Sequence, residues 1–518
     1  MREELTFQAL LQTSLRKHSN RILAKFGDKQ YTYKEVDLAS SRVANAINTA
    51  GFGLGDRIAT ILPNSFELLT IAYGIYKSGA TYSPLNMMVG DNDIVYIVSD
   101  ANVKVIFVDV SQKERLSRIK DKLKGLEKII VVNSSSEKEY ESFDEFIRGK
   151  PIDEPKLNVA ADNEGLILYT GGTTGTPKGV VHSQYNLALA TLGHCLMGYI
   201  EMNDIFLLMT PLSHAAGWIL YSGTCIGAKF VIERQFDPLK LVELIEKEKV
   251  TNIFLVPTII YVMLDILKQK KYDMSSLKHM FYGASPIQAS RLEEALQVFG
   301  PILIQKYGLT ECPNMITTLT VADHLNVKTN PELLRSCGKA DVMVTVKIAD
   351  DNGQELPIGE LGEILVRAPY LMKEYLNQPE LTAETLAGGW LHTGDMGRMD
   401  ENGYVYIMDR KKDMIISGGM NVYPAEVEAV ISQHPRVKQV SVIGVPDDKW
   451  GESVMAVVVP NETVDEKEIK DFCRSKLAKF AQPKKIVFQD GLPMTIIGKV
   501  DKKALRAPYW QNKDRAVH

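Results

Sequence analysis

From about residue 57 onward, short apolar runs alternate with amphipathic stretches. Runs rich in Val, Ile and Leu predict buried strands at 57–63, 103–109, 128–133, 165–170, 206–210, 229–233, 252–257 and 302–308. Helical periodicity lies between several of them, most clearly at 238–250 and 259–270. This alternation predicts an α/β fold, with a large N-terminal domain of largely parallel sheets and flanking helices.

The pattern changes after about residue 345, where turn residues separate short β-rich segments. Asp400-Glu401-Asn402-Gly403 predicts a hairpin in this β-rich subdomain. Beyond residue 412, a helix that begins at Pro424, strands at 438–445 and 455–460, a helix at 466–477 and a strand at 484–488 predict a small α+β unit. We therefore expect an N-terminal domain of residues 1–411 and a C-terminal domain of residues 412–518.

Composition narrows the class of protein without identifying it. The 518 residues are 45% hydrophobic and 24% charged, with a net charge of −4, which does not favour nucleic-acid binding. The five cysteines include no CxxC pair, so neither a disulfide framework nor a zinc site is expected. The first twenty residues lack the apolar core of a signal peptide, and the longest apolar stretch, 218–227, is shorter than the ~20 residues of a membrane span. A cytoplasmic protein without a membrane span is expected.

The stretch YTGGTTGTPKG at 169–179 is the first candidate for chemistry. Glycines let backbone N–H groups approach an anion, while threonine hydroxyls and a lysine add donors and charge, so the composition suits a phosphate cradle. The nucleotide-binding pattern G-x-x-x-x-G-K-[ST] is not met, because Pro177 precedes Lys178 and Gly179 follows it. A flexible surface loop is the alternative reading.

Seven segments must be considered together with their order and spacing. They are YTGGTTGTPKGVVHS (169–183), PLSHAAGW (211–218), YGASP (282–286), QKYGLTE (305–311), LHTGDMG (391–397), DRKKDMIISGGMNVYPAEVE (409–428) and GLPMTIIGKVDKKALR (491–506). In this order they resemble the adenylate-forming superfamily, which comprises acyl-CoA synthetases, adenylation domains of peptide synthetases and firefly luciferase. The resemblance covers nearly the whole chain.

The resemblance implies a two-step reaction. A carboxylate attacks the α-phosphate of ATP to give acyl-AMP and pyrophosphate, and the thiol of coenzyme A then displaces AMP. ATP, Mg2+ and coenzyme A are the implied cofactors and co-substrates. The small C-terminal domain would be mobile and would rotate between the two steps. Homodimers occur in the family, so a homodimer is a weaker expectation.

The resemblance also assigns residues to roles. Catalytic roles fall to Lys499 as the adenylation lysine, Thr310 on the α-phosphate and Glu311 on magnesium, with His214 as a positioning residue beside the substrate carboxylate. The cofactor site would comprise Thr170, Gly172, Thr173, Thr174, Gly175, Thr176 and Lys178 around the β- and γ-phosphates; Tyr282, Gly283, Ala284, Ser285, Tyr307 and Gly308 around adenine; Asp395 on the ribose hydroxyls; and Arg410 on the ribose or a phosphate. Lys412 matches the hinge, and Gly418 and Gly419 would line the thiol channel.

The segment after PLSH limits which carboxylic acid can be the substrate. No Asp or Glu occurs from His214 to Phe230, so the ammonium of an amino-acid substrate would have no partner there. A medium- or long-chain fatty acid is expected, and an aryl or cinnamic-type acid is the alternative. Coenzyme A is favoured as acceptor because no carrier domain follows residue 518, although a carrier protein loaded in trans stays open. The rival classes are a luciferase-like oxidase and a non-catalytic AMP-sensing scaffold.

Overall fold

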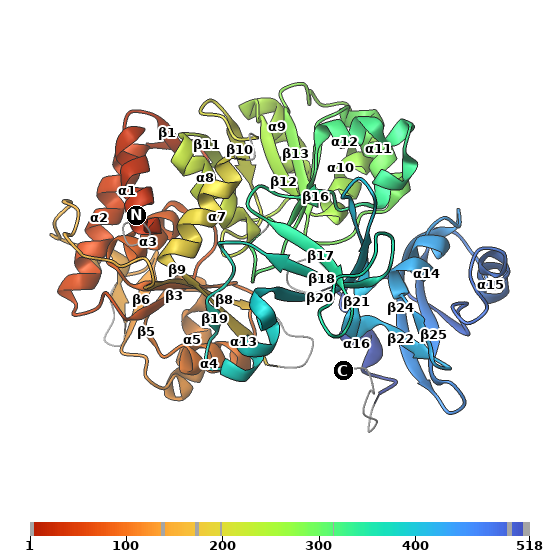
Figure 1. The fold of residues 1–518 in the computed structure, drawn as a ribbon. Coiled ribbons are helices and arrows are strands. Elements are labelled where there is room, and N and C mark those ends of the chain that lie inside the picture. Colours follow the sequence, from red (N-terminus) through yellow and green to blue (C-terminus); the bar gives the residue numbers. More distant parts are fainter. Residues whose placement is uncertain are drawn as a thin grey trace.

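The computed structural model describes residues 5–135, 140–170, 176–196, 199–313, 315–494 and 500–510. Figure 1 shows a larger part that contains the N-terminus and a smaller part, built around β22, β24, β25, α14 and α15, to one side. This is the expected arrangement of a large N-terminal domain and a small C-terminal domain. The boundary at residues 411 and 412 stays a prediction.

Two large sheets form most of the N-terminal domain. Among the described residues the first has nine strands in the order β16-β15-β14-β13-β12-β10-β11-β1-β2 and the second has eight in the order β19-β9-β8-β4-β3-β5-β6-β7. Their interior pairs are mostly parallel, with antiparallel pairs toward the ends. The strands of the first sheet are β1 Ile22–Phe26, β2 Lys29–Thr32, β10 Ile205–Leu208, β11 Lys229–Ile232, β12 Asn252–Leu255, β13 His279–Gly283, β14 Leu303–Tyr307, β15 Thr317–Leu319 and β16 Lys339–Ala340; those of the second are β3 Arg57–Ile61, β4 Thr81–Leu85, β5 Val103–Asp109, β6 Lys128–Val132, β7 Glu141–Ser142, β8 Glu164–Thr170, β9 Lys178–Ser183 and β19 Glu374–Tyr375.

Two smaller sheets follow along the chain. A four-stranded antiparallel sheet comprises β17 Thr345–Ala349, β18 Gly362–Arg367, β20 Leu391–Met399 and β21 Val405–Arg410. The C-terminal sheet comprises β22 Ile415–Ser417, β23 Met420–Val422, β24 Val437–Asp447, β25 Gly451–Pro460 and β26 Lys485–Phe488. The first of these is the predicted β-rich subdomain, and its β20–β21 hairpin turns at the predicted Asp400–Gly403, with Gly403 at φ +80°.

Helices cover the sheets, as Figure 1 shows. In the described part of the chain they are α1 Phe7–Lys17, α2 Tyr33–Thr49, α3 Phe66–Lys77, α4 Asp91–Asp100, α5 Lys113–Ile119, α6 Phe143–Phe146, α7 Gln184–Leu196, α8 Ala215–Ile226, α9 Pro238–Glu248, α10 Pro257–Gln269, α11 Ala289–Phe299, α12 Val321–Leu325, α13 Pro379–Thr385, α14 Pro424–Ile431, α15 Glu466–Arg474 and α16 Lys502–Arg506. None of the described helices is long and apolar enough to cross a membrane.

Local sequence signals account for most of these elements. All eight apolar runs form strands, namely β3, β5, β6, β8, β10, β11, β12 and β14. Helix α9 begins where the sequence indicates: Pro238 occupies its first turn, and the Asp237 side chain accepts from the backbone N–H groups of Leu239 and Lys240. The sequence analysis did not identify β4 or β9. Pro84 lies inside β4, and proline is unusual in a strand that has neighbours on both sides.

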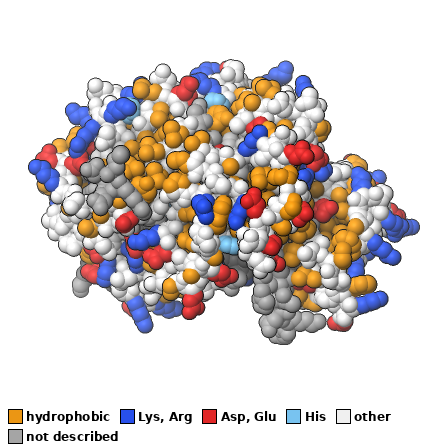
Figure 2. Space-filling model, viewed as in Figure 1, with side chains coloured by type: hydrophobic (Ala, Val, Ile, Leu, Met, Phe, Trp, Pro, Cys, Tyr) orange, Lys and Arg blue, Asp and Glu red, His pale blue; other side chains and the backbone are white. Residues whose placement is uncertain are grey.

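The surface agrees with the mixed composition. Figure 2 shows acidic and basic side chains interspersed over the face seen in Figure 1, and hydrophobic side chains gathered where α7 and α8 lie. Leu196 at the end of α7 contributes one of the exposed apolar side chains, at 63% exposure.

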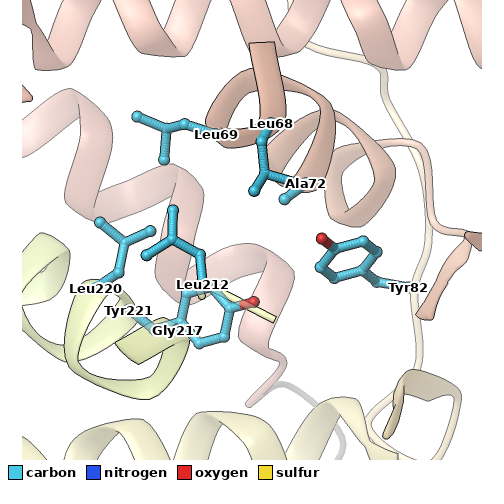
Figure 3. Close-up of a pocket in the computed structure, with 8 residues that line it drawn as sticks. All are labelled: Leu68, Leu69, Ala72, Tyr82, Leu212, Gly217, Leu220 and Tyr221. Carbon is cyan, nitrogen blue, oxygen red and sulfur yellow. The ribbon is translucent and has the colours of Figure 1, made fainter. Parts of the chain in front are cut away.

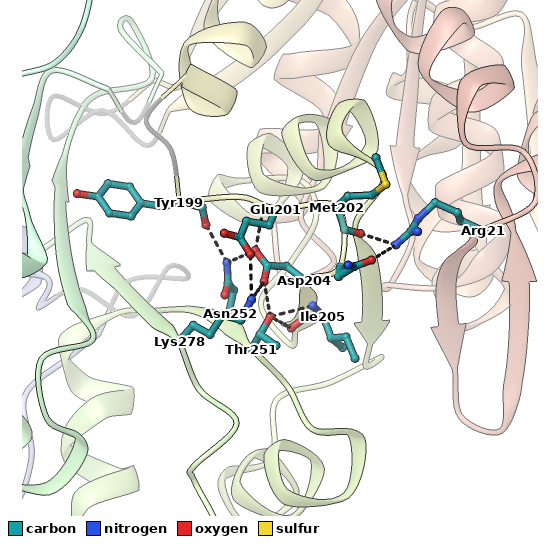
Figure 4. A network of polar contacts seen from close by, with 10 residues as sticks. Arg21, Tyr199, Glu201, Met202, Asp204, Ile205, Thr251, Asn252 and Lys278 are labelled. Carbon is teal, nitrogen blue, oxygen red and sulfur yellow. Dashed lines mark hydrogen bonds and ion pairs between the residues drawn. The ribbon is translucent and has the colours of Figure 1, made fainter.

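A buried polar network joins three parallel strands of the first sheet near their amino ends (Figure 4). The Asp204 carboxylate, which is buried, accepts from the Thr251 hydroxyl (3.0 Å), the Asn252 amide (3.2 Å) and Lys278 Nζ (3.2 Å). It also accepts from the backbone N–H of Glu201 at 2.7 Å. The network therefore attaches the segment before β10 to the starts of β12 and β13.

We expect Asp204→Ala to destabilise the protein by about 3 kcal/mol, because it removes the buried acceptor that four donors share. Urea unfolding at pH 7, followed by circular dichroism, measures this as a lower midpoint. Glu201→Gln is the matched control: its carboxylate also meets Lys278 but is 66% exposed, so a loss below about 1 kcal/mol is expected. Equal losses in the two variants would contradict the assignment.

Candidate active site

Three of the predicted site residues meet where the nine-stranded and four-stranded sheets approach each other. Tyr307 ends β14, and Asp395 on β20 is paired with Arg410 on β21. The Tyr307 hydroxyl donates to one Asp395 oxygen at 2.5 Å, and Arg410 Nε donates to the other at 2.7 Å. The Asp395 side chain is only 5% exposed. An ionised carboxylate only accepts hydrogen bonds, so this group suits a ligand that donates them.

Positive charge gathers around this carboxylate. Burial by itself lowers the pKa of Arg410, but the nearby Asp395, Tyr307 and Glu311 raise the pKa overall. Burial also lowers the pKa of Lys412, and Arg410 and Lys178 lower it further against the opposing effects of Asp413 and Asp395. Arg410 and Lys178 thus lie close enough to Lys412 to lower its pKa. Such a group of cations suits a polyanionic ligand.

The loop after β14 places Thr310 and Glu311 beside the eight-stranded sheet. The Tyr375 hydroxyl on β19 donates to Glu311 Oε1 at 2.6 Å, and Lys178 Nζ lies 5.5 Å from the centre of the Tyr375 ring. Glu311 is half-buried, and its second carboxylate oxygen accepts no hydrogen bond from the residues that the structure describes. A carboxylate with a neighbouring hydroxyl is a hard oxygen donor set, which fits Mg2+ when phosphates supply most of the ligands. Among the residues described, no group of three or more His, Cys, Asp or Glu side chains could hold a metal ion by itself.

The phosphate loop closes the hairpin between β8 and β9. Thr170 and Lys178 are paired across the two strands, so both ends of the loop are fixed. Thr176 is exposed and Lys178 is half-buried. The predicted residues Gly172, Thr173, Thr174 and Gly175 lie outside the described residues, and so does Lys499.

The YGASP segment (282–286) begins at the end of β13, and its side chains differ in burial. The Tyr282 side chain is buried in the core, and its hydroxyl lies 2.9 Å from His324 Nε2 and 3.2 Å from Gln305 Oε1. At Gly283 a Cβ would lie 2.2 Å from the Lys306 carbonyl oxygen, so only glycine fits against β14 there. Ala284 is exposed with φ +67°, a strained conformation of the kind found at functional sites. Ser285 is half-buried, and Gly308 follows Tyr307 with similar exposure.

Gly418 and Gly419 form the turn between β22 and β23, with φ +60° and +78°. A Cβ at Gly418 would lie 2.4 Å from the Trp450 ring. Absence of a side chain at Gly418 thus admits a tryptophan in this structure, while Gly419 has open space around it.

His214 lies at the start of α8, the helix after PLSH. It is half-buried, and burial lowers its pKa, so the neutral imidazole is favoured near neutral pH. An apolar cavity of about 10 Å³, the size of one water molecule, lies between α3, β4 and α8 (Figure 3). Leu212, Gly217, Leu220 and Tyr221 contribute to its wall. The residues after His214 thus belong to an apolar environment, as the sequence indicated.

The sequence analysis missed two residues that contact this site. Tyr375 holds Glu311, and the buried His182 on β9 lies with Nε2 2.8 Å from the Thr310 carbonyl oxygen. Tyr375 lies outside the seven motifs. His182 lies within the segment 169–183, but nothing in that segment indicates its contact, because each residue acts on a loop more than sixty residues away in the chain.

The comparisons with known proteins agree with this geometry. The family model for the AMP-binding enzyme matches residues 11–376, and that for the AMP-binding enzyme C-terminal domain matches residues 426–499. The medium/long-chain-fatty-acid–CoA ligase FadD8 of Mycobacterium tuberculosis is 36% identical over 525 residues, covering 98% of this chain and 91% of the relative.

Two solved structures share the fold over almost their whole length. The anthranilate CoA ligase AuaEII, in complex with anthranoyl-AMP, gives a TM-score of 0.90 at 26% identity and covers 98% of this chain and 97% of its own. ATP-bound MatB from Rhodopseudomonas palustris gives a TM-score of 0.88 at 30% identity and covers 97% of this chain and 99% of its own.

Fold and site together define an adenylate-forming enzyme. The chain belongs to the AMP-binding enzyme family and, within it, to the AMP-forming acyl-CoA synthetases, which are acid–thiol ligases that use ATP and coenzyme A.

The segment from Asp409 to Asp413 connects the four-stranded sheet to the C-terminal sheet. Asp409 Oδ2 accepts from the backbone N–H of Ala425 in the first turn of α14 at 2.8 Å. Burial raises the pKa of Asp409 to about 6, an effect that Lys502 opposes and Glu428 reinforces. Lys502 in turn pairs with Glu428 at 2.9 Å, and Arg506 pairs with Asp413.

We expect Asp409→Asn to gain stability relative to the parent as pH rises from 4 to 7. The raised pKa means that folding favours the protonated carboxyl. The free energy of unfolding of the parent therefore falls as pH rises toward 6, by up to about 3 kcal/mol, and changes little at higher pH. Urea midpoints of both proteins at pH 4.5, 5.5 and 7 measure the difference. Asp351→Asn, at an exposed carboxylate beside Lys411, is the control and should show a far smaller pH dependence. A difference independent of pH would contradict the raised pKa.

Proposed function

We propose that this acyl-CoA synthetase activates a medium- or long-chain fatty acid. The observation that carries the proposal is the apolar environment of α8, in which Trp218, Ile219 and Leu220 are buried and no carboxylate lies between His214 and Phe230. An aliphatic tail that packed against these side chains would meet no unpaired charge. The similarity to FadD8, which is named for medium- and long-chain fatty acids, supports the same substrate class.

An aryl or cinnamic-type acid is the second candidate. The structural likeness to an anthranilate CoA ligase favours it, because an aromatic acid is equally compatible with an apolar pocket. A carrier protein in place of coenzyme A is the alternative acceptor.

We infer that Asp395 accepts the ribose hydroxyls, with Arg410 supporting it, and that the backbone of Tyr282 to Ser285 borders adenine together with Tyr307 and Gly308. Lys178 and the threonines of the loop would hold the β- and γ-phosphates, and Thr310 the α-phosphate. Glu311 would hold Mg2+, which supplies charge neutralisation for the departing pyrophosphate.

In the adenylation step the substrate carboxylate forms a bond to the α-phosphorus, and the bond from that phosphorus to pyrophosphate breaks. Negative charge develops on the α-phosphate and on the leaving pyrophosphate, so fixed cations lower the barrier. Arg410 and Lys178 are such cations in the described structure, and Lys499 is our candidate for the third. His214, as the neutral imidazole, would orient the carboxylate rather than transfer a proton.

For the second step we infer that the C-terminal domain turns about Lys412, which exchanges Lys499 for the thiol, and that Gly418 and Gly419 border the thiol's path. A domain boundary at residues 411 and 412 is part of this proposal, as are a cytoplasmic location and a homodimer.

The substrate is tested by pyrophosphate release from ATP and Mg2+ with octanoate, palmitate, benzoate, cinnamate or acetate, each with and without coenzyme A. We expect octanoate or palmitate to give the fastest release and a thioester when coenzyme A is present. Preference for benzoate or cinnamate would transfer the assignment to an aryl acid. Release indifferent to coenzyme A would favour a carrier protein, and oxygen consumption with light emission would indicate an oxidase.

The Lys499→Ala variant should lose pyrophosphate release by roughly 100-fold or more, because a cation at the reacting centre is removed. Lys503→Ala, an exposed lysine four positions further on, is the matched control and should behave like the parent. Equal activity of the two variants would contradict the role of Lys499 and would suit a non-catalytic scaffold.

A further inference from the structure

The loop between β14 and β15 is held at three consecutive carbonyl groups. The donors to the carbonyls of residues 310–312 are, in order, His182 Nε2 at 2.8 Å, the backbone N–H of Met372 at 2.8 Å and the backbone N–H of Leu309 at 3.1 Å. Only the third donor belongs to the loop itself. The positions of Thr310 and Glu311 are therefore imposed by β9 and by the segment before β19.

His182 has a single protonation state near neutral pH. Its side chain is fully buried, and its Nε2 faces a carbonyl oxygen, which can only accept, so Nε2 carries the proton. Its Nδ1 has no partner among the residues described. Burial lowers the pKa of His182 to about 4, so the ring stays a neutral donor near pH 7.

His194 on α7 lies at the other end of the loop. Burial and Lys306 lower its pKa to about 3 against the opposing effect of the Pro313 backbone. Its Nε2 is buried without a partner in the described part of the chain, and a proline carbonyl can only accept, so a hydrogen bond to Pro313 would use Nδ1 as the donor. The two neutral histidines would then use opposite ring nitrogens to hold two carbonyls of one loop.

Strand β9 links this loop to the phosphate end of the site. It begins at Lys178 and continues to His182, which also lies edge-on to Trp218 of α8, with ring centres 5.9 Å apart. One connection between Lys178 and Thr310 therefore runs through a single strand and a single hydrogen bond. A misplacement of about 1 Å between groups that hold a reacting phosphate costs on the order of 100-fold in rate.

We propose that His182 and His194 are positioning residues for the adenylation half-reaction, which fix Thr310 and Glu311 against the phosphate-binding strand by hydrogen bonds to the loop carbonyls. The proposal rests on the roles proposed above for Thr310 and Glu311. Neither histidine touches the reacting atoms. Both act on formation of the acyl-adenylate and not on attack by the thiol.

Substitution by Asn or Gln distinguishes a histidine that donates a hydrogen bond to the loop from a histidine that only fills space in the core. The side-chain nitrogen of Gln can take the position of Nε2 in a histidine, and that of the shorter Asn the position of Nδ1. His182→Gln and His194→Asn should therefore keep the donor, whereas His182→Asn and His194→Gln should lose it. A core-filling role predicts no such crossed pattern, because the same two amides are placed at both sites.

The experiment measures the two half-reactions separately in the full chain. Pyrophosphate release without coenzyme A reports adenylation, and thioester formation from supplied acyl-AMP and coenzyme A reports the second step. We expect His182→Leu to lower the adenylation rate about 10- to 100-fold, mainly in kcat, with less than about a 2-fold change in the second step. His182→Gln and His194→Asn should stay within about 3-fold of the parent.

Binding and stability provide readouts besides turnover. Calorimetric titration with an acyl sulfamoyl adenosine, a stable mimic of the acyl-adenylate, should show weaker binding in His182→Leu and recovery in His182→Gln. His279→Leu is the control, since His279 is another histidine whose pKa is lowered by burial and whose Nδ1 has no described partner, at the far end of β13. It should lower the thermal midpoint without altering either half-reaction or the binding.

Equal loss in both half-reactions, equal behaviour of Gln and Asn at both positions, or an adenylation defect in His279→Leu that matches His182→Leu would overturn the proposal. If the Leu variants do not fold, the crossed Gln and Asn comparison decides by itself. Failure of the proposed function can be distinguished from failure of the positioning role, because the parent protein would then release no pyrophosphate with any acid.

Discussion

The buried carboxyl group of Asp395 is the constraint on which the arrangement of the site depends. A carboxylate taken out of water costs several kcal/mol unless it is paired and hydrogen-bonded. Tyr307 comes from the nine-stranded sheet, while Arg410 lies beside Asp395 in the four-stranded sheet. Satisfying this one group therefore fixes how two sheets meet. The chain continues from Tyr307 directly into the loop that carries Thr310 and Glu311.

The eight-stranded sheet holds the other side of that loop. Met372 and Tyr375 bind Glu311 through its backbone and side chain, and His182 binds the Thr310 carbonyl. Three sheets thus contribute to a site that none of them contains alone. The uncharged donors hold the backbone, while Arg410 pairs with Asp395 and lies, like Lys178, close enough to Lys412 to lower its pKa. This division suits phosphate chemistry, in which positioning and charge neutralisation do most of the catalysis.

The connection to the C-terminal domain is itself built from charged groups. Asp409 contacts the first turn of α14, Asp413 pairs with Arg506, and Lys412 between them lies near Arg410 and Asp395. Hydrogen bonds and ion pairs of this kind can be exchanged for others at modest cost, unlike a large apolar interface. The rotation proposed for the small domain would therefore involve the same residues that connect it to the site.

The sequence by itself determined the elements and the family. Apolar runs placed eight strands, helical periodicity placed α9, a proline placed the start of α14, and Asp400–Gly403 placed a hairpin, since each signal is local and acts through backbone preferences. Seven motifs in order were enough to indicate an adenylate-forming enzyme. Its candidate residues Tyr307, Asp395 and Arg410 could be named from those motifs, but not their mutual hydrogen bonds.

Only the tertiary structure decided which side chains meet. It placed Pro84 inside a strand, directed Tyr282 into the core and brought His182 to Thr310 and Tyr375 to Glu311 across 128 and 64 positions of the chain. Such contacts arise from the register of strands at sheet edges and from burial of polar groups that require partners. These depend on the whole packing and leave no periodic trace in the local sequence.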